Sequence, residues 1–164
     1  LSVAQVAKAK GAAKIFVSDP SPLAQRVIAQ FVDFTVIDPT AQTLADAVRG
    51  HKCTTRIHAI FDSVGLEDIP REAMPLLAEA GTYVNLAVHD VPLHLNASAL
   101  GSERSITTSS NALYRDEREA HALLCDGAVD VRPMITHRFP LEQFQKAFDL
   151  LLQEPKAAYK VVFT

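Results

Sequence analysis

Short apolar runs that alternate with helical patterns are the feature that most constrains the fold of this chain. The runs are too short for buried helices and read as strands, whereas the stretches between them show helical spacing of apolar residues. Strands are expected at 14–18, 34–37, 57–65, 82–88, about 104–109, 134–139 and 157–163, and helices at 1–10, 22–31, 40–49, 68–80, 115–126 and 141–152. Such alternation indicates βαβ units, so we predict a doubly wound α/β fold with a parallel sheet.

The stretch GAAKIFVSDPS, residues 11–21, contains the first strand of this pattern and an aspartate just after it. In a dinucleotide-binding fold, an acidic residue at the end of the second strand binds the adenosine ribose. A first strand and a glycine-rich turn would precede it, and here only a ten-residue helix does. Asp19 is therefore either a ribose-binding acid, which would favour NAD over NADP, or a turn residue that partly caps the next helix.

Two further strand ends carry candidate binding residues, because ligands of open α/β sheets bind outside the carboxyl ends of the strands. Asp62, Ser63, Val64 and Gly65 form the turn after one strand, and Leu86, Ala87 and Val88 end the next. The turn could flank a nucleotide or simply join a strand to a helix. The three apolar residues could line a nicotinamide pocket or belong to the core.

Composition and motifs exclude several other functions. The net charge of −3 argues against nucleic acid as the main partner, and the apolar runs are too short to cross a membrane. The two cysteines, Cys53 and Cys125, indicate reduced thiols in a cytoplasmic protein, with Cys125 expected to pack. The histidines and Cys53 match no standard zinc spacing, so no metal site is predicted. The sequence has no G-x-S-x-G, P-loop or G-x-G-x-x-G motif.

The C-terminal run DGAVDVRPMITHRFPLEQFQKAFDLL, residues 126–151, resembles the end of zinc-dependent medium-chain alcohol and polyol dehydrogenases, such as sorbitol and 2,3-butanediol dehydrogenases. GTYVNLAV and SITTSSNALYR are similar to the last two nucleotide-domain strands of that family. The opening LSVAQVAKAKGAAKIFVSDPS resembles the helix after its glycine motif, followed by the second strand. The resemblance covers essentially the whole chain.

This resemblance implies a Rossmann-like parallel sheet that lacks its first strand and glycine-rich turn, with a C-terminal tail segment. Residues 1–127 would form the incomplete NAD(P)-binding domain, and residues 128–164 the tail that returns to the catalytic domain. NAD would be the cofactor. The family's zinc ligands lie in a catalytic domain of which this sequence shows no counterpart, so we expect no catalytic residue and no metal ligand here.

The resemblance also assigns cofactor-binding residues, position by position. Asp19 matches the ribose-binding acid, and Ser63, Val64 and Gly65 match the turn that faces the adenosine and pyrophosphate. Leu86, Ala87 and Val88, with Ser109, Ser110 and Asn111, match the stretches that approach the nicotinamide. Lys160 lies about where a basic residue reaches the pyrophosphate in some relatives.

Leu1 in place of a methionine, and the missing features, lead us to expect a portion of a longer dehydrogenase. Alone, the chain is expected to be inactive, unstable and a poor binder of NAD. A competing hypothesis is a non-catalytic remnant that acts as a dimerisation or interaction module through residues 82–110. A third, an unrelated α/β binding domain, conflicts with the tail. A homo-oligomer that acts on a small alcohol or polyol is expected for the full-length protein.

Overall fold

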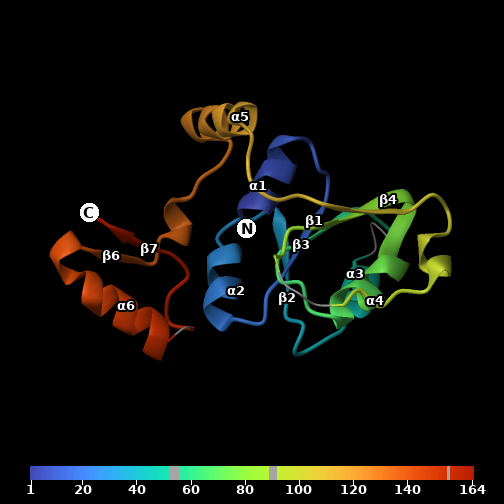
Figure 1. The fold of residues 1–164 in the computed structure, drawn as a ribbon, viewed down its shortest axis with the longest axis horizontal. Coiled ribbons are helices and arrows are strands. Elements are labelled where there is room, and N and C mark those ends of the chain that lie inside the picture. Colours follow the sequence, from blue (N-terminus) through green and yellow to red (C-terminus); the bar gives the residue numbers. More distant parts are fainter. Residues whose placement is uncertain (52–55, 89–91, 155) are drawn as a thin grey trace. The chain divides into compact units, whose positions relative to one another are not determined.

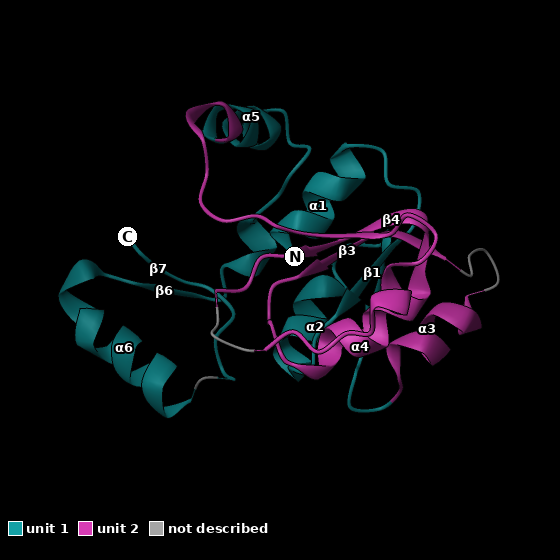
Figure 2. Cartoon of the chain, turned by 45° about the vertical axis from the view of Figure 1, so that its right-hand side comes forward, with its two compact units in different colours: residues 1–41, 117–164 teal, residues 42–116 magenta. Residues whose placement is uncertain are grey.

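The computed structural model describes residues 1–51, 56–88, 92–154 and 156–164 (Figure 1). The chain divides into two compact units (Figure 2). Unit 1 contains residues 1–41 and 117–164, and unit 2 contains residues 42–116. The predicted boundary between residues 127 and 128 remains a prediction.

The first part of unit 1 is a helix–strand–helix–strand segment. Its elements are α1 (Ser2–Ala9), β1 (Ile15–Ser18), α2 (Pro22–Ile28) and β2 (Phe34–Ile37), and β1 pairs in parallel with β2. Gly11 follows α1 with a φ of +92°, a conformation that glycine adopts without strain. The hydroxyl of Ser21 caps α2 by accepting a hydrogen bond from the Ala24 amide, as the Ser-Pro pair predicts.

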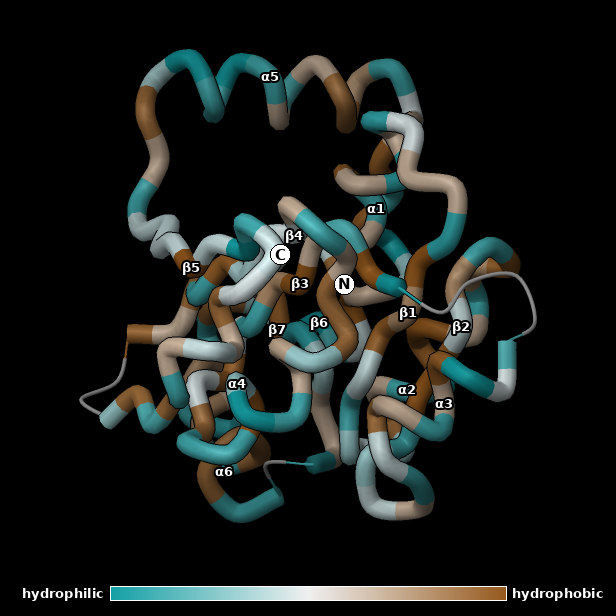
Figure 3. Tube along the Cα trace, turned by 90° about the vertical axis from the view of Figure 1, so that its right-hand side faces the viewer, coloured by the Kyte–Doolittle hydropathy of each residue, from teal (hydrophilic) through white to brown (hydrophobic). Residues whose placement is uncertain are grey.

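The C-terminal part of unit 1 holds a second parallel pair of strands, β6 and β7. Its elements are α5 (Tyr114–Cys125, whose first residues belong to unit 2), a 3-10 turn at Arg132–Met134, β6 (His137–Phe139), a 3-10 turn at Leu141–Gln143, α6 (Phe144–Gln153) and β7 (Val161–Phe163). Helix α5 alternates hydrophilic and hydrophobic stretches and buries no residue (Figure 3). Cys125 is exposed, with Sγ 3.7 Å from Nδ1 of His121, so the expectation that it packs in a core is wrong.

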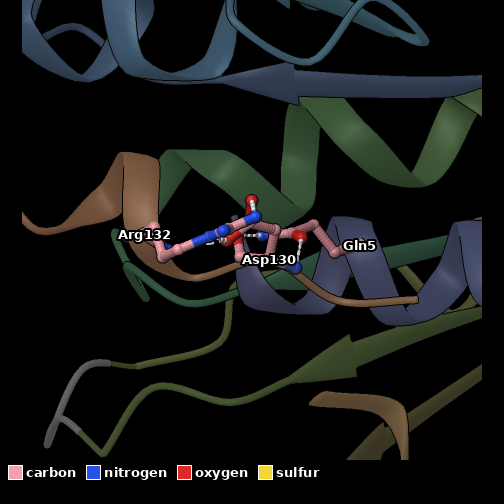
Figure 4. A network of polar contacts seen from close by, with 3 residues as sticks. All are labelled: Gln5, Asp130 and Arg132. Carbon is pink, nitrogen blue, oxygen red and sulfur yellow. Dashed lines mark hydrogen bonds and ion pairs between the residues drawn. The ribbon is translucent and has the colours of Figure 1, made fainter. Parts of the chain in front are cut away.

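A buried glutamine joins the two parts of unit 1. Gln5 of α1 is only 4% exposed, and its side-chain amide pairs with the backbone of Asp130 (Figure 4). Nε2 donates to the Asp130 carbonyl at 3.0 Å, and Oε1 accepts from the Asp130 amide at 2.7 Å. The buried side chain thus has both its hydrogen-bonding ends satisfied. Tyr159 packs against the core formed by Ala24, Ile28 and Phe34.

Unit 2 is built around a three-stranded parallel sheet in the order β3-β4-β5. Its elements are α3 (Leu44–Gly50), β3 (Ile57–Asp62), α4 (Asp68–Ala73), a 3-10 turn at Met74–Leu76, β4 (Leu77–Asn85), a 3-10 turn at Ala97–Leu100 and β5 (Ser105–Thr108). The core contains Ala73, Met74, Leu77 and Tyr83, each at most 1% exposed. The parallel α/β prediction is therefore confirmed.

The predicted helix at residues 68–80 ends early. The α-helix stops at Ala73, Pro75 lies in the 3-10 turn, and β4 already begins at Leu77. Proline lacks an amide hydrogen and interrupts a helix, which explains the stop. Gly81 lies within β4, beside a shift in strand register, where a β-carbon would meet the Ala78 carbonyl at 3.0 Å. It marks a bulge rather than a helix end.

Several other helices and strands are shorter than predicted. Strand β4 ends at Asn85 and β5 at Thr108, so Leu86–Val88 and Ser109–Asn111 lie in the connections that follow these strands. Helix α3 begins at Leu44 rather than residue 40, because Thr43 caps it by accepting from the Asp46 amide at 3.1 Å. None of the helices in the described residues combines the length and apolar character that a bilayer crossing requires.

Candidate cofactor-binding site

In unit 1, Asp19 lies directly after β1 and is partly buried. Its Oδ1 accepts a hydrogen bond from the Ser21 amide at 2.8 Å, and its carbonyl accepts from Nε2 of Gln25 at 2.8 Å. Its own amide donates to the Ile37 carbonyl at 3.2 Å, which ties it to the end of β2. The described residues give no hydrogen bond to Oδ2. Asp19 thus shapes its turn with one oxygen, and the described residues leave the other without a hydrogen-bond donor.

Asp38 occupies the equivalent place after β2, and the sequence interpretation missed it. Its Oδ1 accepts from the amide and the hydroxyl of Thr40, at 2.8 and 2.7 Å. These bonds, led by the hydroxyl, lower the pKa of Asp38 below its ordinary value. The signal was available, because Asp38 follows an apolar run just as Asp19 does.

Tyr159, from the C-terminal part of unit 1, lies close enough to Asp19 to interact with its charge. Burial and then the negative charge of Asp19 raise the pKa of the Tyr159 hydroxyl. The predicted Lys160 follows it and is exposed. The Lys160 carbonyl accepts from the amide of Thr136 at 3.0 Å, so its backbone is anchored. Unit 1 therefore contains Asp19, Asp38 and Lys160, with Tyr159 near Asp19.

In unit 2, Asp62 ends β3 and organises the predicted turn. It is 5% exposed, and its Oδ1 accepts from the amides of Val64 and Gly65 at 2.8 and 3.0 Å. Oδ2 accepts from the hydroxyl of Tyr83 at 2.6 Å. Gly65 has a φ of +73°, which a residue with a side chain would adopt only with strain. Ser63 and Val64 are exposed on this turn.

The two remaining predicted segments leave neighbouring strands at the same edge of the unit 2 sheet. The Leu86 amide donates to the Asp62 carbonyl at 2.8 Å, and the Ser109 amide donates to the Asn85 carbonyl at 3.1 Å. Ser109, Ser110 and Asn111 line a cleft of about 360 Å³ together with Thr108, Ala112, Leu113 and Asp116. Leu86 and Ala87 are half-buried and Val88 is exposed. The structure thus brings the predicted unit 2 residues to the ends of β3, β4 and β5.

A zinc site needs three or four converging ligands. Within the described parts of the chain, no three His, Cys, Asp or Glu side chains gather in this way. Cys53 and His89, which were considered in the sequence, lie outside the described residues. We therefore assign no zinc ligand among the residues that the structure describes.

Residues 1–125 match the zinc-binding dehydrogenase family. L-galactonate-5-dehydrogenase of Escherichia coli K12 is 23% identical over 150 residues, which cover 91% of this chain and 44% of that protein. Sorbitol dehydrogenase 1 of Saccharomyces cerevisiae is 28% identical over 113 residues, which cover 66% of this chain and 31% of that protein. The chain therefore spans less than half the length of these curated relatives.

Solved structures show the same fold. An alcohol dehydrogenase of E. coli CFT073 complexed with NADH gives a TM-score of 0.85 at 20% identity, covering 99% of this chain and 48% of that one. A Sinorhizobium meliloti 1021 protein bound to NADP gives 0.79 at 22% identity, covering 98% and 47%. The family match, the relatives and the Rossmann-like fold agree with the resemblance seen in the sequence. The chain belongs to the zinc-binding dehydrogenase family, that of the zinc-type medium-chain alcohol dehydrogenases, and it matches less than half the length of the relatives described above.

Proposed function

We propose that this chain is the NAD-binding portion of a zinc-dependent dehydrogenase that transfers hydride between a secondary alcohol or polyol and NAD. The proposal rests on Oδ2 of Asp19, which lies just after β1 and accepts no hydrogen bond from the described residues, whereas Oδ1 accepts one from the Ser21 amide. A carboxylate there accepts hydrogen bonds from the ribose hydroxyls and repels a 2′-phosphate. Both NADH- and NADP-bound proteins occur among the similar structures, so the preference has to be tested on this chain.

The other predicted residues would hold the rest of the cofactor. Ser63, Val64 and Gly65 would face the adenosine side, and Lys160 would attract the pyrophosphate. Leu86–Val88 and Ser109–Asn111 would enclose the nicotinamide end. The bound nicotinamide supplies hydride transfer, and the chain's own residues bind and orient it.

We also propose that the 164-residue chain has no dehydrogenase activity by itself. The support is its length, since it spans less than half of each relative described above. The test is an assay with sorbitol, 2,3-butanediol and L-galactonate in the presence of NAD. Turnover by the purified chain would refute this part of the proposal.

The test of cofactor binding is a titration of the ¹⁵N-labelled chain with NADH and NADPH to about 5 mM, followed by NMR, which reaches millimolar Kd values. We expect weak binding that favours NADH. Asp19→Asn should weaken NADH binding about tenfold and reduce the preference over NADPH, because one charge-assisted hydrogen bond is lost. Asp149→Asn is the matched control, since it makes the same change in unit 1 on helix α6 rather than at a strand end. Equal losses in both variants, or tighter binding of NADPH, would contradict the proposal.

The competing function, a dimerisation or interaction module, has one observation in its favour. Among the described residues, β5 pairs only with β4, so its other side is an open strand edge that can pair with another chain. We propose a homo-oligomer through residues 82–110. Sedimentation of the chain across a range of concentrations tests it, and a monomer throughout would remove the support for this function.

A further inference from the structure

The buried carboxylate of Asp62 is held by three hydrogen bonds from the protein itself. Oδ1 accepts two hydrogen bonds from the backbone of its own turn, and Oδ2 accepts one from the hydroxyl of Tyr83 at 2.6 Å. Both residues are buried, with exposed fractions of 5% for Asp62 and 1% for Tyr83. Three of the roughly four acceptor positions of the carboxylate are filled from inside the protein, and the side chain is shielded from solvent. Asp62 is therefore suited to hold structure rather than to react.

The strand register and the core packing of Tyr83 hold its hydroxyl in a fixed position. Tyr83 lies in β4, where its register partner is Ile60 of β3, and Asp62 is two residues further along the same face. Its ring packs against Ala73, Met74 and Leu77. Burial, followed by the hydrogen bond and charge of Asp62, raises the pKa of Tyr83 far above its ordinary value. The hydroxyl therefore stays a donor at every pH at which a protein is normally studied.

The turn above this pair carries the exposed residues Ser63 and Val64. Two of its amides point back to Asp62, and Gly65 takes the left-handed conformation that closes the turn. An apolar pair of similar shape would fill the core without the desolvation cost of a buried charge. What the carboxylate adds is a connection between the core tyrosine and the turn.

We propose that Tyr83 and Asp62 are positioning residues that hold the turn at 63–65 in the shape that receives the adenosine side of NAD. This inference rests on the proposed function. Tyr83 itself does not touch the cofactor. It fixes the Asp62 carboxylate, and the carboxylate fixes the two amides that define the turn.

Two variants separate a positioning role from a general role in stability. Tyr83→Phe removes only the hydroxyl, and Asp62→Asn keeps an oxygen for the two amides and gains an NH₂ that can donate to the oxygen of Tyr83. Ile106→Val is the matched control, because Ile106 packs against the same core as the register partner of Tyr83 in β5 and carries no hydrogen-bonding group. Each variant is made in the full 164-residue chain, and wild type and variants are compared by NMR.

In Tyr83→Phe, we expect hydrogen exchange of the Val64 and Gly65 amides to rise about tenfold more than that of the β4 amides. NADH binding should weaken about tenfold, as expected for the loss of one hydrogen bond to a charged group. Asp62→Asn should fall between wild type and Tyr83→Phe in both measurements, since its NH₂ can donate to the oxygen of Tyr83 while the Tyr83 hydroxyl hydrogen loses its acceptor. Ile106→Val should leave the turn and NADH binding unchanged.

The outcomes distinguish this inference from the function on which it rests. If the wild-type chain binds NADH and Tyr83→Phe binds it equally well, the inference is overturned and the proposed function stands. If no NMR signal of the wild-type chain responds to NADH, the proposed function is wrong, and the proposed role of Tyr83 and Asp62 in cofactor binding is wrong too. Exchange of Val64 and Gly65 that is unchanged in Tyr83→Phe would overturn the inference in either case.

Discussion

Asp19 in unit 1 and Asp62 in unit 2 occupy similar places in the chain but have different surroundings. Each lies at the carboxyl end of a parallel strand and uses Oδ1 to accept from an amide of the following turn. Tyr83 occupies the second oxygen of Asp62, whereas the described residues give no hydrogen bond to that of Asp19. Under the proposed function, this difference separates an acidic strand end that receives a ligand from one that holds a turn. We infer that the deciding factor is whether a buried donor already reaches the second oxygen.

The strongest test of this contrast is Asp62→Ala. The substitution leaves the Tyr83 hydroxyl and the amides of Val64 and Gly65 without their acceptor. A buried donor without a partner costs about 1–3 kcal/mol, so we expect unit 2 to lose about 3 kcal/mol or more. Hydrogen exchange of the β3 and β4 amides measures the loss in this unit alone. A change below about 0.5 kcal/mol would show that the three bonds contribute little.

Gln5→Leu tests whether the stability of unit 1 depends on a buried polar contact as much as that of unit 2 does. Leucine leaves the amide and carbonyl of Asp130 without the two side-chain partners seen in the structure. We expect a loss of about 2 kcal/mol in the stability of unit 1, because two partly buried backbone groups become unsatisfied. Urea unfolding followed by exchange of the α1 amides is the measurement.

The control for this variant is Gln145→Leu. Gln145 is exposed and donates to Asp149 one helical turn away, at 3.0 Å. Exposed substitutions of this kind change stability by less than about 0.5 kcal/mol. If both variants lost the same amount, burial of Gln5 would not be the cause.

Asp19→Ala should have a much smaller effect on stability than Asp62→Ala. The Ser21 amide that Asp19 accepts from is only partly buried and can turn to water. We expect a loss of less than about 1 kcal/mol, the usual contribution of one hydrogen bond. Urea unfolding, monitored by hydrogen exchange of the β1 and β2 amides, measures this loss of stability. A loss as large as that of Asp62→Ala would remove the distinction between the two aspartates.

The sequence predicted the local features well, because they depend on neighbouring residues. The strand at 34–37 is where the pattern placed it, and Ser21 caps α2 at a Ser-Pro pair, a combination that favours a helix start. The start of β4 at Leu77, between Pro75 and Gly81, was missed, since one helix was expected over residues 68–80. Local spacing did not indicate that a strand begins between them.

The contacts that define the site could not be predicted in the same way. Tyr83 is 21 positions from Asp62, and Gln5 is 125 positions from Asp130. Gln5 lies among apolar residues of an expected helix and looks like a surface residue by type. Its burial follows from a segment at the other end of the chain. Residue type and spacing carry no information about such pairings, which only the folded backbone creates.

The smallest expected effect concerns Asp130, an exposed carboxylate in unit 1. The guanidinium and amide of Arg132 donate to it, and these bonds hold the pKa of Asp130 at about 2, below its ordinary value of 3.8. Because the folded pKa is lowered, the stabilisation is present above about pH 4 and is lost as the pH falls towards 2. Arg132→Gln should raise the pKa back towards 3.8, as a carboxyl ¹³C titration would show. Unit 1 stability near pH 7 should barely change, since exposed ion pairs contribute little. A large loss at pH 7 would mean that Arg132 supports the Gln5 contact to the Asp130 backbone, and that unit 1, like unit 2, depends on a carboxylate to hold a turn.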